Sequence, residues 1–195
     1  MRVQARNDKL WFALLFLLPF IFVLFQFGAF SHGAEREGIR IRAGLDLFPS
    51  LLAADLNIQD KTGRDGKLHL VLAHADIPEK AKEFAAHLAS VERIRGVSIR
   101  VVIADYQSLD QFTDQTIAGV FLIQPLTHTL KPIITFAREH QCILFSPFEG
   151  DVERGVSGGM HISDRVLPYL NISALEAANI RIKSFFLRVS VRYAE

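Results

Sequence analysis

The serines near the end of the chain are the residues that most resemble a catalytic nucleophile. Ser157 stands in the run Gly155-Val-Ser-Gly-Gly, which is similar in composition to the G-x-S-x-G turn of serine hydrolases. That turn follows a strand and opens a helix, whereas Ser157 stands at the start of a predicted strand. Ser146 and Ser163 stand in no such motif. We therefore predict no catalytic residue and a protein that is not an enzyme.

The seven histidines do not form a metal-binding pattern. No two of them have the spacing of four that places ligands on one helix face. His69 and His74 are five apart on a predicted strand, where side chains alternate with period two. Glu149, Asp151 and Glu153 could pair for acid–base catalysis, but such a cluster is more often a solvated surface loop. We predict no metal site and no cofactor.

Arg154 and the glycines after it form the most unusual local feature of the chain. Exposed backbone amides and a guanidinium at the mouth of a strand can hold an anion, a carboxylate or a protein partner. The alternative is that Gly158 and Gly159 permit a bulge or close packing, since no nucleotide-binding glycine spacing accompanies them. The candidate ligand or partner contacts are Arg154, Ser157, Gly158, Gly159, Arg165 and Asn171.

The turn after the first predicted strand is a weaker candidate for anion binding. The run from Asp76 to Glu79 is typical of a helix start, with Asp76 as the N-cap and Pro78 in the first turn. Because Asp76 would place its own negative charge at the helix N-terminus, we expect that position to be filled. Ser173 and Glu176 similarly fit the capping box of a later helix.

These residues must be positioned by alternating strands and helices. Continuous apolar runs predict strands, and apolar spacing of three and four predicts helices. Strands are expected at 68–73, 97–104, 117–124, 142–145, 155–163 and 166–171, and helices at 40–56, 76–93, 129–140 and 173–179. Uninterrupted apolar strands are typical of a parallel sheet covered on both faces. We predict one three-layer α/β domain with a mainly parallel central sheet, a C-terminal antiparallel strand pair and an amphipathic last segment over 180–191.

Residues 1–34 have the layout of an export signal. Arg2, Arg6 and Lys9 precede an apolar run from Leu10 to Phe30, and small residues follow it. The run is also about long enough to span a bilayer, so a cleaved signal peptide and a retained N-terminal anchor are both open. In either case, residues 35–195 are expected to form one domain in the periplasm.

The charge of the exported body excludes two classes of partner. Residues 1–34 hold three of the 22 basic residues and one of the 21 acidic residues, which leaves a net charge of about −1. Scattered Lys and Arg give no electrostatic footprint for nucleic acid or for an anionic membrane surface. The one cysteine, Cys142, lies in an apolar run and is predicted to be buried, with no intramolecular disulfide available.

The C-terminal third resembles the YfiR/HmsC family of exported bacterial proteins. That family ends in a Gly-Gly-Met strand, an R-V-x-x-x-x-N strand, a helix and a leucine-rich segment preceded by isoleucine and serine. The corresponding parts of this chain are Gly158-Gly159-Met160, Arg165 to Asn171, Ser173 to Asn179 and Ile182 to Arg188. The resemblance extends more loosely over residues 40–190. Regulatory members commonly carry cysteine pairs, whereas this chain has one cysteine.

The resemblance implies a periplasmic α/β protein, often a homodimer, whose best-known relatives hold down an inner-membrane diguanylate cyclase by binding its periplasmic sensor portion. We therefore expect a non-enzymatic regulator of an inner-membrane sensor or diguanylate cyclase, acting in cyclic di-GMP signalling. The alternative is a periplasmic small-molecule-binding protein that serves a transporter or a sensor. A pocket with paired titratable groups would instead indicate a hydrolase.

Overall fold

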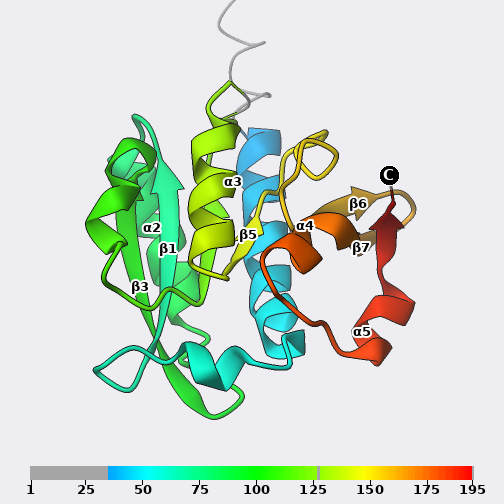
Figure 1. The fold of residues 1–195 in the computed structure, drawn as a ribbon. Coiled ribbons are helices and arrows are strands. Elements are labelled where there is room, and N and C mark those ends of the chain that lie inside the picture. The colour runs from blue at the N-terminus through cyan, green and yellow to red at the C-terminus, as the bar shows by residue number, and fades with distance from the viewer. Residues whose placement is uncertain (1–34, 127, 195) are drawn as a thin grey trace, which may run out of the picture. The chain divides into compact units, whose positions relative to one another are not determined.

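The computed structural model describes residues 35–126 and 128–194 (Figure 1). The predicted leader, residues 1–34, lies outside the described residues. Within the described part, no helix is long and apolar enough to cross a membrane. The residues from Arg40 onward cluster into one unit. This unit contains all the described strands and all the predicted site residues.

One sheet of eight strands forms the centre of this unit, in the order β2-β3-β1-β4-β5-β6-β7-β8. The strands are β1 Leu68–His74, β2 Arg93–Ile94, β3 Val97–Asp105, β4 Gly119–Leu122, β5 Ile143–Phe145, β6 Gly158–Ile162, β7 Val166–Asn171 and β8 Val191–Tyr193. The five strands from β3 to β6 in this order are parallel, and β6 and β7 form an antiparallel pair. The predicted fold class is therefore confirmed.

Helices cover both faces of the sheet (Figure 1). They comprise the helix over residues 35–54, α2 Pro78–Ala89, α3 Leu130–Glu139, α4 Ile172–Ala177, α5 Ser184–Val189 and the 3-10 helices η1 Ile58–Lys61 and η2 Tyr106–Phe112. One hydrophobic cluster joins the sheet to the helix over 35–54 and α2, and a second joins it to η2 and α3. Successive residues of β1 enter opposite clusters, with Leu70 and Leu72 in the first and Val71 and Ala73 in the second. This explains the uninterrupted apolar run, because a strand buried on both faces has no solvent side.

The helix over residues 35–54 lies in direct contact with the sheet. The ring of Phe48 packs against those of Phe121 and Phe145, at centroid distances of 5.5 and 5.6 Å. A Cβ atom at Gly119 would stand 2.7 Å from Phe48 Cζ, and one at Gly158 would stand 2.6 Å from Leu51 Cδ2. Both contacts are closer than a side chain allows, so these strand glycines make the close approach possible.

Two predicted helix caps are wrong. The N-cap of α2 is Ile77 and carries no side-chain cap, because the Asp76 carboxylate accepts a hydrogen bond from Gln124 Nε2 instead. The N-cap of α4 is Asn171, whose side chain accepts from the amide of Ala174 at 2.9 Å. The helix starts directly where β7 ends, so Ser173 already lies inside its first turn and cannot cap it.

Other helix boundaries differ from the predicted ones because the neighbouring residues pair as strands. The helix predicted over 76–93 ends at Ala89, because Arg93 and Ile94 pair with β3 as β2. The segment over 180–191 divides into α5 and β8, since the residues from Val191 pair in parallel with β7. Pro49 does not interrupt the first helix, which continues to residue 54.

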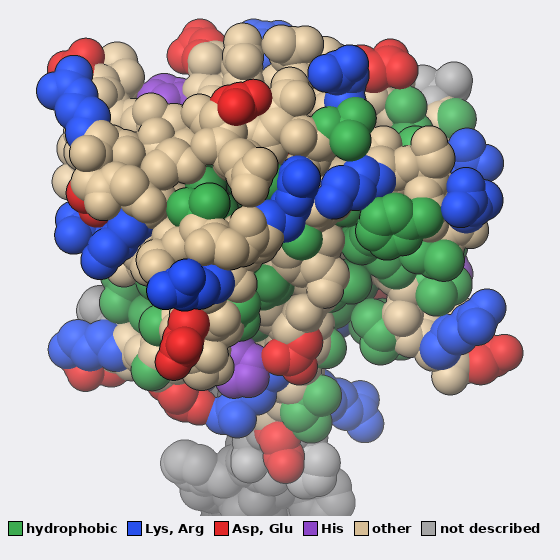
Figure 2. All heavy atoms as spheres, turned by 90° about the horizontal axis from the view of Figure 1, so that it is seen from below, with side chains coloured by type: hydrophobic (Ala, Val, Ile, Leu, Met, Phe, Trp, Pro, Cys, Tyr) green, Lys and Arg blue, Asp and Glu red, His purple; other side chains and the backbone are tan. Residues whose placement is uncertain are grey.

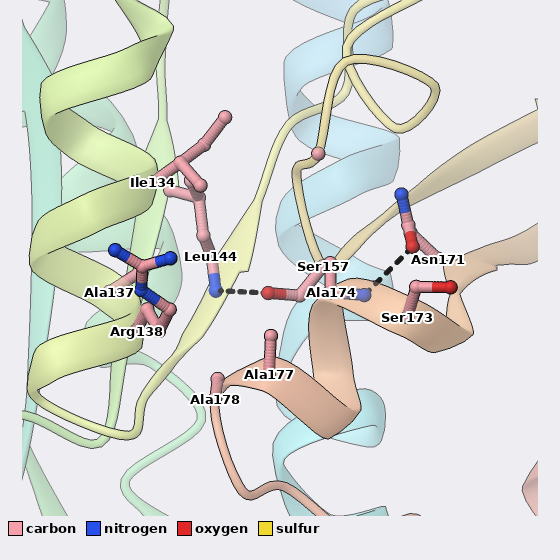
Figure 3. A pocket seen from close by; sticks show the side chains of 11 residues that line it. Ile134, Ala137, Arg138, Leu144, Ser157, Asn171, Ser173, Ala174, Ala177 and Ala178 are labelled. Carbon is pink, nitrogen blue, oxygen red and sulfur yellow. Dashed lines mark hydrogen bonds between the residues drawn. The ribbon is translucent and has the colours of Figure 1, made fainter.

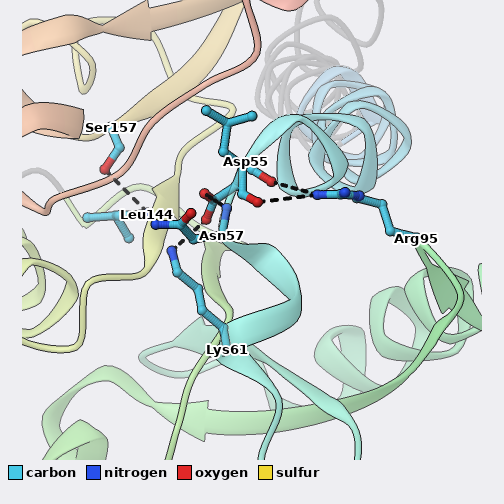
Figure 4. A network of polar contacts seen from close by, with 7 residues as sticks. Asp55, Asn57, Lys61, Arg95, Leu144 and Ser157 are labelled. Atoms are coloured by element: carbon cyan, nitrogen blue, oxygen red, sulfur yellow. Dashed lines mark hydrogen bonds and ion pairs between the residues drawn. The ribbon is translucent and has the colours of Figure 1, made fainter.

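A buried ion pair fixes the end of that first helix (Figure 4). Lys61 Nζ donates to Asp55 Oδ2 at 2.6 Å, and the amide of Asn57 donates to Asp55 Oδ1 at 3.0 Å. Arg95 Nη1 donates to the backbone carbonyl of Asp55 at 3.3 Å. Asp55 also forms a backbone bridge with Ile182. These contacts join the first helix to η1, the β2–β3 turn and the C-terminal segment.

Replacing Gly159 by valine should destabilise the fold. A Cβ atom there would stand 2.7 Å from both the carbonyl oxygen of Ser146 and Val152 Cγ2. Overpacking of this kind costs about 1–3 kcal/mol, and each kcal/mol lowers Tm by about 2–4 °C in a protein of this size. Calorimetry should show a drop of several degrees. Gly38→Ala is the control, because no atom lies within 4 Å of a Cβ there, and an unchanged melt for Gly159→Val would contradict the packing role.

Candidate functional site

A cleft of about 200 Å³ lies between α3 and α4 (Figure 3). Leu144 of β5 lies between the two helices, and Gly155 and Ser157 contribute from the loop before β6. The cleft therefore sits over the junction of β5 and β6, where the parallel part of the sheet gives way to the antiparallel pair.

Small and aliphatic side chains make most of the cleft wall: Ile134, Ala137, Leu144, Ala174, Ala177 and Ala178. The alanines of α4 keep this helix from filling the space between itself and α3. An apolar cavity of roughly 150 Å³ can hold benzene. The cleft therefore has room for a group of about one aromatic ring.

The polar groups of the cleft differ in how many hydrogen bonds they already make within the protein. Both ends of the Asn171 amide are engaged, because Oδ1 accepts from Ala174 and Nδ2 donates to the carbonyl of Val152 at 2.8 Å. The hydroxyl of Ser157 accepts from the amide of Leu144 at 3.4 Å. The guanidinium of Arg138 has no hydrogen bond or ion pair with residues 35–126 or 128–194. Arg138 is thus the charged donor in the cleft that is available to a ligand, and no motif in the sequence marks it as such.

The structure brings together only two of the predicted contact residues. Ser157 and Asn171 both line the cleft, and each is almost fully buried. Gly158 and Gly159 lie inside the packed sheet and do not reach the surface. Arg165 is exposed at the turn between β6 and β7, on the hairpin rather than in the cleft.

Arg154, the remaining predicted contact, helps to hold its own loop. Its Nη1 lies 3.3 Å from Asp151 Oδ1, and Ser146 Oγ donates to Asp151 Oδ2 at 2.6 Å. Asp151 is fully buried, so the expectation of a solvated carboxylate is wrong for this residue. Burial raises the pKa of Asp151, and the hydrogen bond from Ser146 and the charge of Arg154 partly offset that rise. The loop is therefore organised around a buried carboxylate.

Cys142 is buried, as predicted, at the start of the β5 segment. Burial raises the pKa of its thiol to about 12, which keeps it protonated at neutral pH. Within residues 35–126 and 128–194, no three His, Cys, Asp or Glu side chains gather where they could hold a metal ion.

Four large apolar side chains are exposed on the last elements of the chain. Ile162 and Val166 face each other across the β6–β7 hairpin, and Phe185 and Val189 lie on α5, each between 46 and 56% exposed. We call these four residues the C-terminal apolar surface. Figure 2 shows exposed hydrophobic side chains flanked by Lys and Arg on the side where Figure 1 draws α5.

Sheet alternation relates the hairpin residues to α5. Ile162 and Val166 lie on the same sheet face as Met160, which packs against the core cluster that contains Phe186 of α5. α5 is followed directly by β8, the last strand of the sheet order, so the apolar surface adjoins a sheet edge. This surface could not be predicted from the sequence, because period-two and helical spacing do not show which apolar residues remain uncovered.

Solved structures include proteins that are similar to this chain. No family model matches the chain, and no curated protein matches its sequence. Among solved structures, it is similar to an ABC domain in complex with L-Trp from Streptococcus pneumonia, with a TM-score of 0.45 and 9% identity. The similarity covers 73% of this chain, which spans 60% of the length of that one.

The thiol of Cys142 should resist labelling in the folded protein. A pKa of about 12 leaves on the order of a thousandfold less thiolate at neutral pH than an ordinary cysteine has. Reaction with a maleimide, followed by mass spectrometry, should be slow until denaturant is added. Ala86→Cys supplies an exposed thiol on α2 as the reference. Labelling of Cys142 as fast as that of the reference would show that the β5 segment opens readily.

Proposed function

We propose that this protein is an exported, non-enzymatic regulator that binds an inner-membrane signalling protein through the C-terminal apolar surface. The partner class, a sensor or diguanylate cyclase that acts through cyclic di-GMP, rests on the resemblance to the YfiR/HmsC family. Export rests on the residues of the leader. The exposed surface is the observation of this structure that supports the proposal.

Several exposed apolar side chains in one region indicate a binding surface. Single exposed apolar residues are normal on any protein, whereas a contiguous group marks an interaction site. Of the seven exposed large apolar residues in the described chain, four lie on the β6–β7 hairpin and α5. Burying them against a partner would gain free energy that the isolated protein does not realise.

Charge around this surface suggests the character of the partner. Arg165 lies at the hairpin turn, Arg188 on α5 and Arg192 on β8, and all three are exposed. None of them forms an ion pair with another described residue. A partner with an apolar centre and an acidic rim would complement both features. The open backbone edge of β8 could also accept a strand from that partner.

Removing the apolar side chains of α5 should weaken partner binding without unfolding the protein. The double variant Phe185→Ser and Val189→Ser changes residues that are 55 and 56% exposed, so Tm should change little. Loss of two buried interface side chains should reduce affinity at least about tenfold. Affinity capture from membranes with the tagged protein, quantified by mass spectrometry of the captured sensor or cyclase, measures this.

Val91→Ser is the matched control, because Val91 is also an exposed apolar residue but lies in the turn after α2. It should capture the partner as well as the unmodified protein does. Undiminished capture by the double variant, with an unchanged melt, would contradict the proposal.

A second candidate function, small-molecule binding, is favoured by the α3–α4 cleft. An apolar slot with the unpaired guanidinium of Arg138 and the hydroxyl of Ser173 suits a compact ligand that joins an apolar body to a carboxylate. This function is compatible with the first, because the ligand site and the apolar surface use different residues.

Benzoate is a suitable probe for the cleft. At ten times its Kd, a ligand stabilises the folded state by about 1.4 kcal/mol, which should raise Tm by a few degrees. Arg138→Ala should abolish the shift, whereas Lys131→Ala, an exposed cation on the same helix, should keep it. No shift at millimolar benzoate in the unmodified protein would count against a carboxylate site in the cleft.

A further inference from the structure

A groove of about 830 Å³ lies between η2 and α3. It shares no lining residue with the α3–α4 cleft, because the two cavities are lined by different faces of α3. It also contains no residue of the C-terminal apolar surface. Sites for small ligands have volumes of about 300–1,000 Å³. The η2–α3 groove is therefore a separate candidate site, and it is the larger of the two cavities.

η2 and α3 run in the same direction along this groove. η2 follows β3 and leads to β4, and α3 follows β4 and leads to β5. Because these strands all run parallel in the sheet, both helices begin at the carboxyl ends of the strands and end near the amino ends. Tyr106 and Lys131 therefore lie toward one end of the groove, and Thr113 and His140 lie toward the other.

The floor of the groove is apolar. Leu109 of η2 and Phe136 of α3 line it, are 4 and 9% exposed, and belong to the same hydrophobic cluster. The imidazole ring of His140 stacks on that of Phe136, with ring centroids 3.9 Å apart. This floor can hold an aliphatic or aromatic side chain, as the apolar walls of ligand sites commonly do.

Charges of opposite sign lie toward the two ends of the groove. Lys131 is in the first turn of α3, Glu139 is its last residue, and Asp110 lies in the second half of η2. All three side chains are exposed, and none forms an ion pair with residues 35–126 or 128–194. The dipole of α3 has the same sense as these charges. The groove is therefore positive at the end where α3 begins and negative where α3 ends.

His140 adds a hydrogen-bond acceptor at the negative end. Its Nδ1 lies 2.9 Å from the carbonyl oxygen of Phe136. Because a carbonyl oxygen can only accept, Nδ1 carries the proton, and Nε2 of the neutral ring is left as an acceptor. The end of α3 thus presents the carboxylate of Glu139 and an imidazole nitrogen to a cationic donor.

The spacing of these charges indicates the length of a ligand. Lys131 and Glu139 are eight residues apart on one helix, which separates their backbone positions by about 12 Å. An extended peptide spans about 3.3–3.6 Å per residue, so three or four residues cover this distance. A peptide of that length carries a carboxylate at one end and an ammonium group at the other.

We propose that the η2–α3 groove binds a peptide of three or four residues through its two free ends. The terminal carboxylate pairs with Lys131, and the terminal ammonium group donates to Glu139 and to His140 Nε2. The apolar side chains of the peptide lie on Leu109 and Phe136. Such a ligand complements the groove in charge at both ends and in polarity at the floor.

The arrangement favours a peptide over singly charged ligands. A plain anion would use only Lys131, and a plain cation would use only the acidic end with Glu139 and Asp110. Asp105 precedes Tyr106 in the chain but does not line the groove, and its carboxylate already accepts from the amide of Gln107 at 2.8 Å. No carboxylate among the lining residues therefore lies beside Lys131 at the positive end.

Titration followed by nitrogen-15 NMR tests this proposal on the full chain in detergent micelles. The probe is the tetrapeptide Ala-Leu-Leu-Ala, and the observed signals are the backbone amides of η2 and α3. We expect saturable shifts of these signals with the free peptide. Acetylation of its N-terminus or amidation of its C-terminus should each weaken binding about three- to fivefold, since each removes one charge pair. No saturable shift in η2 and α3, or equal affinity for the blocked peptides, would overturn the proposal.

Two substitutions connect each end of the peptide to its partner. Lys131→Gln should weaken binding of the free tetrapeptide about three- to fivefold, and amidation of the peptide should then have no further effect. Glu139→Gln should weaken it to a similar degree. Lys80→Gln on α2 and Glu176→Gln on α4 are the matched controls, because both residues are exposed and lie outside the groove. Unchanged affinity in Lys131→Gln, or undiminished sensitivity of this variant to amidation, would contradict the assignment.

Discussion

The helix over residues 35–54 can lie on the sheet only because the strand positions that face it carry no side chain. Phe48 and Leu51 occupy the space where Cβ atoms of Gly119 and Gly158 would stand. This close contact brings the rings of Phe121 and Phe145 against the helix, and the buried Asp55–Lys61 pair fixes where the helix ends. Gly158 is the first residue of β6, so this packing joins β6 directly to the helix.

Three of the residues that carry the family resemblance, Gly158, Gly159 and Asn171, are packing residues in this structure. Gly158 and Gly159 admit Leu51 and the backbone of Ser146, and Asn171 caps α4 while it holds the carbonyl of Val152. Their hydrogen bonds and packing contacts lie within the fold, so we propose that recognition of other molecules depends on groups that remain available. Those groups are the exposed apolar residues near the sheet edge and the guanidinium of Arg138.

The central strands and long helices could be predicted from the sequence, because β1, β4 and β5 are apolar on both faces and α3 has regular spacing. The caps could not, because a side chain distant in sequence competes with the local one. Gln124 draws Asp76 away from α2 across 48 residues. The cleft and the apolar surface depend on which helix covers which strand, and residue spacing does not contain that information. Asp151 likewise becomes buried only when the loop folds around Ser146.

The central proposal is that the protein recognises a membrane partner through the C-terminal apolar surface. Hydrogen–deuterium exchange of the protein, with and without the proposed partner solubilised in detergent, tests it most directly. Partner binding should slow amide exchange in α5, in β8 and at the turn between β6 and β7, since these elements carry the surface and the open edge. Exchange in α3 and in the loop over residues 146–157 should be unchanged. Protection confined to that loop or to α3, with α5 and β8 unaffected, would contradict the account.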